Sequence, residues 1–499
     1  MNIVRKVAVG IFLFASGAFF LHHLHHWKAR YQKDLCAIRD ILKENHPGFY
    51  DTQNPEFAEW LRDGYQQALS FADQVKNFPD YLYGLQFFVQ GFKDNHLRLT
   101  YDTSSLPSEW PGFCIGYQPG YRTGFSEDIQ EADEAFVVTF SKNESIPVGA
   151  QLILCDGMTP RAWLEKYVCA FVDARNIDAS WVTVAPYLSW WRGSSFIPKS
   201  TIYTFSCDGC EWQESPEWKK IVPSEYRART ERKNAPTVAS IKQAGLEQIW
   251  VALPSFHPQT KEEKDALESV IEHLASYAKY DLVIFDVRGN KGGNSYFGTR
   301  ILKKLYGDAC CEGAFKRIRG KRFVEWRASR DNIQYLNGLV EKLRQQSQHQ
   351  EIAVEFGMIV EAMEKCEKLQ QPFYTAASAT DDPSIKIPGE PCKGPCAVLI
   401  TDFACASACL DFIDELYAVT PACQIGLPTN ADTMYLECRD VVLPSGFAIL
   451  HFPIKVFRNR ERGSNEPWLP NQYVLDVYNN RALAKVINES CGVTVLDPA

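Results

Sequence analysis

The stretch that decides the fold is Asp281-Leu-Val-Ile-Phe-Asp286-Val-Arg288-Gly289-Asn290-Lys-Gly292-Gly293-Asn294. It begins with a run of apolar residues, which is typical of a strand buried on both faces. It ends in a glycine-rich turn, where the missing Cβ atoms let backbone N–H groups approach a bound group closely. A helical pattern follows over 295–306. Neither GxxxxGK[ST] nor GxGxxG fits, so the turn does not indicate a nucleotide site.

A second strand, turn and helix follow later, in Cys396-Ala-Val-Leu-Ile-Thr-Asp402-Phe-Ala-Cys405-Ala406-Ser407-Ala408-Cys409. Ser407 lies at the predicted start of the helix, between small residues that leave its hydroxyl accessible. The helix N-terminus and the Ala408 N–H can stabilise negative charge on a substrate oxygen. By itself, a serine at such a position is more often an ordinary N-cap.

Taken together, the two segments resemble the core of the tail-specific (C-terminal processing) peptidase family. The resemblance covers roughly 245–310 and 395–476, including Leu253-Pro-Ser255-Phe256 and Leu443-Pro444-Ser445-Gly446. It implies a serine hydrolase in which Ser407 is the nucleophile. It also implies an oxyanion hole that joins the Ala408 N–H to the N–H of Gly292 or Gly293.

The base and its supporting acid depend on the branch of that family. One branch uses a Lys, but the matching segment, 426–433, contains none. The other branch, which resembles the tricorn core protease, uses His and Glu, and Asp94-Asn95-His96 matches its histidine segment. His96 is therefore the expected base. His46, His257 and His451 look like ordinary strand or loop residues.

Two acids are candidates for orienting His96. Glu466 lies in Asn465-Glu466-Pro467-Trp468-Leu469-Pro470-Asn471, which matches the acidic segment of the His-using branch except for a short spacing to Pro470 and an Asn at 471. Asp432 lies where the sister branch has its Lys. We favour Glu466 on the motif, with Asp432 as the alternative.

The predicted fold class is α/β, with a helical N-terminal segment, a PDZ-like β module and a mixed-sheet (ClpP/crotonase-like) catalytic core. The expected boundaries are 31–100 for the helical domain, 110–175 for the PDZ-like module and 195–480 for the core, with a helical insertion at about 320–370. The PDZ resemblance rests on the turn, strand and turn over 146–157, with Ala150 where an acidic residue is usual. The alternative is an unrelated β-hairpin.

The first 30 residues predict export. Arg5 and Lys6 precede an apolar run over 7–21, which suits a secretory signal peptide or a retained membrane anchor, with a buried helix as the alternative. The first two interpretations give a periplasmic chain, or one anchored in the membrane and facing away from the cytoplasm. Among the 16 cysteines, Cys207 with Cys210, Cys310-Cys311 and Cys392 with Cys396 are candidates for disulfides.

Composition excludes some classes of function. A net charge of −8 and a pI near 5.8 provide no overall basic surface for nucleic acid. No spacing supports a metal site, and the implied reaction needs no cofactor. The resemblance implies a serine-type endopeptidase that acts on unstructured polypeptides or C-terminal tails through an acyl-enzyme on Ser407. The alternatives are a ligand- or peptide-binding scaffold of the same fold and a small-molecule esterase.

Overall fold

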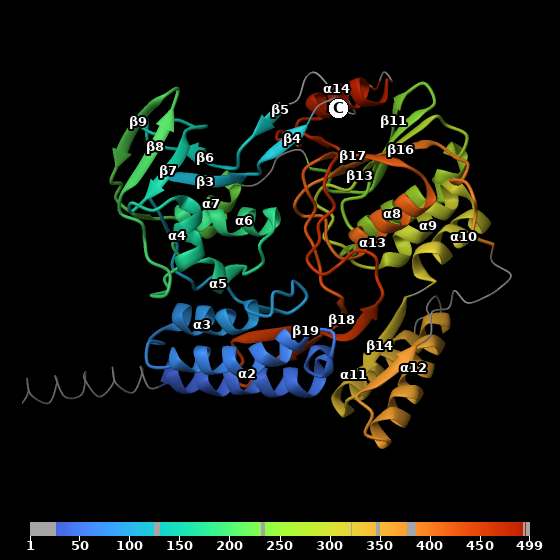
Figure 1. Ribbon diagram of the computed structural model, residues 1–499, viewed down its shortest axis with the longest axis horizontal. Coiled ribbons are helices and arrows are strands. Elements are labelled where there is room, and N and C mark those ends of the chain that lie inside the picture. Colours follow the sequence, from blue (N-terminus) through green and yellow to red (C-terminus); the bar gives the residue numbers. More distant parts are fainter. Residues whose placement is uncertain are drawn as a thin grey trace, which may run out of the picture.

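The computed structural model describes residues 26–123, 130–230, 235–320, 322–345, 350–376, 386–492 and 495 (Figure 1). Its central sheet has the strand order β11-β12-β13-β16-β17-β20, in which only the β11–β12 pair is antiparallel. The strands are β11 (Ser240–Gly245), β12 (Gln248–Ala252), β13 (Leu282–Asp286), β16 (Cys396–Thr401), β17 (Ala422–Gly426) and β20 (Gln472–Tyr473). The two strands predicted at 249–253 and 282–287 are confirmed to within one residue.

Helices cover both faces of this sheet. One face packs against α8 (Lys261–His273), α9 (Ser295–Tyr306), α10 (Asp308–Arg319) and α13 (Ala408–Val419), which lie together in Figure 1. The other face packs against α14 (Asn480–Cys491) and part of α6 (Asp178–Val184). Thr260 and Glu263 form a capping box at the start of α8, and α9 has the bounds that the sequence predicts. Burial on both faces explains why β13 and β16 are apolar throughout.

A second sheet has the order β1-β19-β14-β15, with β18 also paired to β19. Its strands are β1 (Arg98–Tyr101), β14 (Phe323–Arg327), β15 (Phe373–Ala376), β18 (Tyr435–Val442) and β19 (Ala448–Arg458). It shares one hydrophobic cluster with the helix over 26–45, α2 (Pro55–Ser70), α3 (Phe78–Gln90), α11 (Arg330–Arg344) and α12 (Gln350–Lys368). The region near 320–370 therefore packs with the N-terminal helices rather than on the central sheet.

A third sheet has the order β3-β6-β7-β8-β9 and lies above α3 in Figure 1. Its strands are β3 (Phe113–Gln118), β6 (Ala135–Ser141), β7 (Gln151–Cys155), β8 (Tyr203–Cys207) and β9 (Cys210–Glu214). It packs against α4 (Pro160–Tyr167) and α6, with α5 (Cys169–Val172) and α7 (Pro223–Thr230) nearby. β7 falls in the predicted turn, strand and turn, but the sheet continues to Glu214, beyond position 175. The PDZ likeness itself stays a prediction.

The cysteines and the N-terminal segment complete the fold. Cys310 and Cys392 form a disulfide with a Cα–Cα distance of 5.8 Å, whereas Cys207 and Cys210 are free thiols. Within the described residues, no helix is long and apolar enough to cross a membrane, and no group of three metal-ligating side chains is found. The predicted signal or anchor over 7–21 lies outside the described residues.

Candidate active site

The two segments singled out in the sequence meet at one edge of the central sheet. β13 and β16 are parallel neighbours, so the turns that follow them leave the sheet side by side. The turns are joined by backbone hydrogen bonds from Val287 N to the Ile400 oxygen and from Ala406 N to the Asn290 oxygen, both 3.1 Å. Gly289 N adds a 3.1 Å bond to the Asp402 carboxylate. The glycine-rich turn therefore holds the turn that carries Ser407.

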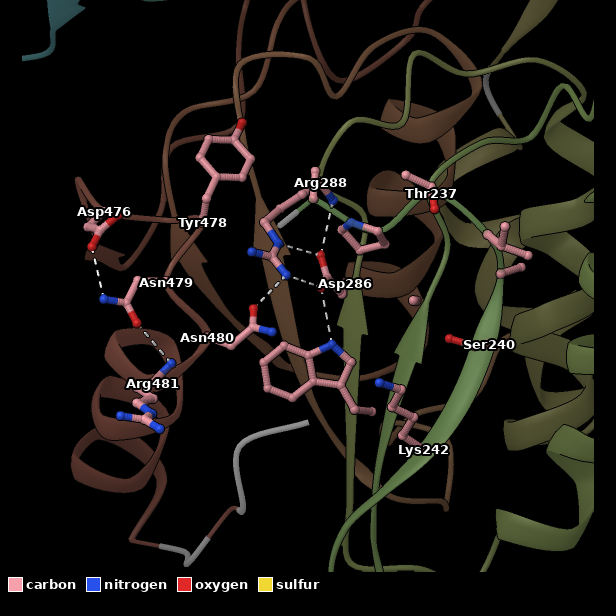
Figure 2. A pocket seen from close by; sticks show the side chains of 16 residues that line it. Thr237, Ser240, Lys242, Asp286, Arg288, Asp476, Tyr478, Asn479, Asn480 and Arg481 are labelled. Carbon is pink, nitrogen blue, oxygen red and sulfur yellow. Dashed lines mark hydrogen bonds and ion pairs between the residues drawn. The ribbon is translucent and has the colours of Figure 1, made fainter. Parts of the chain in front are cut away.

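The charged residues of the first turn are structural. Arg288 pairs with Asp286 at 2.5 Å and also donates to the Val477 oxygen at 2.7 Å. Both side chains are almost completely buried, and Figure 2 shows this pair on the wall of a cavity of about 1080 Å³. Neither Ser407 nor His96 lines that cavity. Because the pair satisfies its own charges, this face of the turn is not where the predicted chemistry would occur.

The backbone of Ser407 separates it from an ordinary N-cap. Its φ is 55° and its ψ is −125°, and its side chain makes no capping hydrogen bond although α13 begins at the next residue. A positive φ is unfavourable for a residue with a Cβ, and such strain clusters at functional sites. The predicted helix start is confirmed, and the hydroxyl is left free of a capping role.

The predicted oxyanion hole can be resolved further. A Cβ on Gly292 would lie 2.8 Å from Ala408 N, so the glycine turn abuts the start of α13. The Gly292 N–H donates to the Asn290 side chain at 2.9 Å. Among the described residues, no hydrogen bond uses the N–H of Gly293 or of Ala408. Gly293 and Ala408 are therefore the better pair of donors.

His96 reaches Ser407 from the other part of the chain. It lies in the loop between α3 and β1, as the sequence predicts, and its Nε2 is 3.2 Å from the Ser407 Oγ across 311 residues of sequence. The imidazole is 16% exposed. For Nε2 to accept the serine proton, the neutral ring must carry its own proton on Nδ1. That Nδ1 atom lies 3.9 Å from Oδ1 of Asp94.

Two buried carboxylates surround His96. Asp94 accepts the His96 backbone N–H at 2.9 Å, and burial raises the pKa of Asp94, with the nearby Asp432 adding to the rise. Burial alone would raise the pKa of Asp432 too, but Arg462, Arg460 and His96 hold that pKa below its ordinary value. The two guanidiniums bind Asp432 at 2.6 and 2.8 Å. Asp432 is therefore ionised, and both acids can act on the imidazole.

The structure does not bring Glu466 to His96. Its exposed carboxylate accepts the Gly463 N–H at 2.7 Å and lines a cavity of about 400 Å³ with Trp468 and Arg322. The tight turn over 463–466 directs the Glu466 side chain outward. The backbone N–H of the neighbouring Asn465 donates to the backbone carbonyl oxygen of Asp432 at 2.8 Å. The segment thus passes close to the site as the motif predicts, but Asp432 and Asp94 supply the carboxylates that the structure places near His96.

Sequence reasoning does not single out Asp94 as a candidate acid, and it keeps His46 only as a spare candidate for the base. In the sequence, Asp94 is only part of the segment that delivers His96, and its spacing of two residues is the available signal. His46 is fully buried, and its Nε2 lies 3.9 Å from Oδ2 of Asp94. Nothing in the local sequence places these two residues together, since the contact depends on how the N-terminal helices pack.

A second hydroxyl–imidazole–carboxylate set lies on the surface. Thr100 Oγ1 is 2.6 Å from Nε2 of His451, whose Nδ1 is 2.5 Å from Asp440. These side chains stand in the middle of β1, β19 and β18, with neither a glycine-rich turn nor a helix N-terminus beside the hydroxyl. Hydrogen-bond distances alone therefore do not define the candidate site; the strained serine and the free N–H groups distinguish Ser407.

Comparisons with known proteins bear on the fold. The structure of mature CPAF complexed with lactacystin matches at a TM-score of 0.57, with 12% identity over 93% of this chain and 98% of that chain. A crystal structure of mature CPAF matches at 0.56, with 13% identity over 94% of this chain and 99% of that chain. The chain has the CPAF fold. This confirms the predicted α/β class at the level of the fold.

The match to CPAF is structural rather than visible in sequence. No protein-family model matches this chain, and no curated protein matches it. The tricorn protease and a photosystem II D1 C-terminal processing protease match at TM-scores of only 0.36 and 0.33, too low to establish a shared fold. The match to CPAF covers 93% of this chain.

Proposed function

We propose that this protein is a serine-type endopeptidase with Ser407 as nucleophile and His96 as base. The observation that carries the proposal is the 3.2 Å approach of Nε2 of His96 to Oγ of Ser407, at a strained residue that begins a helix. A hydroxyl is inert until a base removes its proton, and an imidazole has the pKa for that at neutral pH. The CPAF fold supports the same interpretation.

The reaction follows from the geometry. The Ser407 Oγ attacks the substrate carbonyl carbon while its proton moves to Nε2 of His96. The carbonyl oxygen, now negative, accepts hydrogen bonds from the backbone N–H groups of Gly293 and Ala408. His96 then gives the proton to the leaving amine, and water, activated by the same imidazole, releases the acyl group from Ser407.

We assign the supporting acid to Asp94, with Asp432 as a second negative charge. Asp94 is the carboxylate that approaches Nδ1 of His96, at 3.9 Å. Catalytic hydrogen bonds are often long in free enzymes and shorten once substrate binds. Asp432 is fixed by Arg460 and Arg462, so its charge favours the imidazolium without needing to move.

We propose that the substrates are unstructured polypeptides or C-terminal tails. A cavity of about 920 Å³ lies next to the two acids, and its lining includes Lys93, Thr433 and Asn465. Lys93 precedes Asp94 in the sequence, Thr433 follows Asp432, and Asn465 donates its backbone N–H to the Asp432 carbonyl oxygen. Its walls come from α2, α3, the region of α5, the start of β18 and the end of β19, so an extended chain could lie between the N-terminal helices and the segments around 433–435 and 464–465. No cofactor takes part in the proposed reaction.

Export is part of the proposal. The basic residues and apolar run at the N-terminus support it, and so does the Cys310–Cys392 disulfide, since such bonds persist in oxidising compartments. The protein would then work in the periplasm or anchored to the membrane with its bulk facing away from the cytoplasm.

The test compares digestion of an unfolded, fluorescently labelled polypeptide with hydrolysis of a p-nitrophenyl ester. Wild type should cleave the polypeptide, and Ser407→Ala and His96→Gln should cleave neither substrate. The matched control is His451→Gln, which breaks the surface set with Thr100 and should leave both activities unchanged. Ester hydrolysis without digestion would support an esterase, and the absence of both would support a binding scaffold.

A further inference from the structure

His46 is a second buried histidine behind the catalytic pair. It is fully buried, and its ring stacks on Phe57 at a centroid distance of 4.3 Å and meets Tyr435 edge-on at 4.9 Å. It precedes the short helix over 47–50, and its Nδ1 accepts the Gly48 N–H at 2.9 Å. The ring is therefore held in one orientation by packing and by one hydrogen bond.

That hydrogen bond fixes the tautomer. Because Nδ1 accepts a hydrogen bond from the Gly48 N–H, the proton of the neutral ring must be on Nε2. Burial lowers the pKa of His46 to about 3, so the ring is neutral at physiological pH. The Nε2–H then lies 3.9 Å from Oδ2 of Asp94, which is too long for a hydrogen bond in the structure as it stands.

Three polar atoms of His46, Asp94 and His96 face one another without forming hydrogen bonds. Within the described residues, His46 Nε2, Asp94 Oδ2 and His96 Nδ1 are all buried without a hydrogen bond. Each buried polar group without a partner calls for an explanation, of which a catalytic role is one, and here three such atoms lie together. Asp94 lies between the two rings, with Oδ2 toward His46 and Oδ1 toward His96.

We propose that His46 is a positioning residue that acts through Asp94, presenting its Nε2–H to Oδ2 at 3.9 Å so that the carboxylate stays ionised and aimed at His96. The inference rests on the proposed function. Asp94 needs this support because burial and the charge of Asp432 both raise its pKa. The titratable groups around Asp94 are His46, His96, Asp432, Tyr435 and Cys438, of which His46 offers a fixed neutral donor.

Two substitutions separate this role from a merely structural one. His46→Asn keeps an oxygen where Nδ1 accepts the Gly48 N–H but has no donor that reaches Asp94. His46→Gln places an amide donor near the position of Nε2 but gives up the bond to Gly48. Both lose the ring that packs on Phe57, so their losses of stability should be similar.

If His46 positions Asp94, kcat/KM should fall roughly 10- to 100-fold in His46→Asn, which is the size of effect expected when a charged group loses a donor. It should fall much less in His46→Gln, which keeps a donor. With Asp94 protonated more easily in His46→Asn, His96 should lose its proton at lower pH. The acidic limb of the plot of kcat/KM against pH should therefore shift to lower pH in that variant. Equal rates in the two variants, or a slower His46→Gln, would reduce His46 to a helix cap and overturn the proposal.

A second readout does not need turnover. In Ser407→Ala protein labelled with ¹⁵N-histidine, NMR titration should give a lower pKa for the His96 imidazole when His46→Asn is added than when His46→Gln is added. If His96 titrated identically in the two double variants, the proposed role of His46 would be contradicted, even if the wild-type protein proved to be an active hydrolase. Failure of wild type to hydrolyse any substrate would instead contradict the proposed function, so the two failures are distinguishable.

Discussion

Gly292 lies so close to Ser407 that a Cβ built on the glycine would stand 2.8 Å from the Cβ of the serine and 2.6 Å from the oxygen of Ala406. Its φ of 92° is also a conformation that side chains with a Cβ avoid. The contact joins the turn after β13 to the turn after β16. The glycine-rich motif is thus explained by close packing of two backbones around the nucleophile, without a bound anion.

Gly292→Ala should abolish hydrolysis, because the new methyl group must displace backbone atoms next to Ser407. The matched control is Gly289→Ala, in the same turn, where φ is 81° but a Cβ would meet nothing within 4 Å. The control should cost only the left-handed strain, about 1–2 kcal/mol of stability, and keep its activity. Turnover on the ester and thermal unfolding of both variants provide the check, and an active Gly292→Ala would show that the packing is not needed for catalysis.

The assignment of the acid predicts unequal effects of two amide substitutions. Asp94→Asn should lower turnover by roughly 100- to 10,000-fold, as loss of a triad acid does, because the imidazolium loses its partner. Glu466→Gln should stay near wild type, since that carboxylate contacts Gly463 at the surface. Turnover is compared near pH 8. If the Glu466 variant were the inactive one, the acid would be Glu466, as the motif predicts, and the side chain would have to turn inward when substrate binds.

The two buried acids should affect stability in opposite directions. The folded-state pKa of Asp432 lies below its ordinary value, so its contribution is present at neutral pH and is lost as pH falls below about 4. The pKa of Asp94 is raised, so its ionisation costs stability at neutral pH and nothing once pH lies below the unfolded value.

Asp432→Asn should therefore destabilise the protein at pH 7 by about 3–5 kcal/mol, since it leaves the buried Arg460 without its carboxylate and Arg462 with only Asp414 as a close one. Asp94→Asn should raise stability at pH 7 while it removes activity. Denaturant unfolding at pH 7 and pH 4 measures both: the difference for Asp94→Asn should shrink at pH 4, whereas the difference for Asp432→Asn should persist there and be lost only at lower pH. A loss of stability in Asp94→Asn at pH 7 would argue against an ionised carboxylate there.

The Cys310–Cys392 disulfide ties α10 to the segment before β16 across a sequence separation of 82. In the chain-entropy model, a loop of that length contributes up to about 4.5 kcal/mol to stability. Cys310→Ser should therefore lower the unfolding temperature but leave the ester rate at a permissive temperature unchanged. Cys207→Ser, at a free and half-buried thiol, is the control and should change neither quantity.

The sequence predicts the strands of the central sheet and the helix start at Ser407 well because both depend on local patterns, whereas the nucleophile role of Ser407 comes from the family resemblance and stays a prediction. Buried parallel strands are apolar throughout, and the glycine turn after β13 and the small residues around Ser407 are visible in order along the chain. Position alone also predicts that His96 follows α3. These features need no knowledge of which segments meet in space.

The acids could not be assigned in the same way. Asp432 is buried and paired because Arg460 and Arg462 reach it from beyond β19, and Asp94 faces His46 because the N-terminal helices pack on the second sheet. Each contact joins residues far apart in sequence. The motif predicts Glu466 as the acid, but the structure turns its carboxylate to the Gly463 N–H, because the direction of a side chain in a tight turn is decided by packing.

The central claim is that Ser407 is a nucleophile activated by His96, and covalent labelling tests it most directly. Wild-type protein, treated with a fluorophosphonate and digested for mass spectrometry, should carry one phosphonyl group on Ser407. Labelling should be absent in Ser407→Ala, strongly slowed in His96→Gln and unchanged in His451→Gln. A wild-type protein that stays unlabelled at Ser407, or that labels equally fast without His96, would contradict the account.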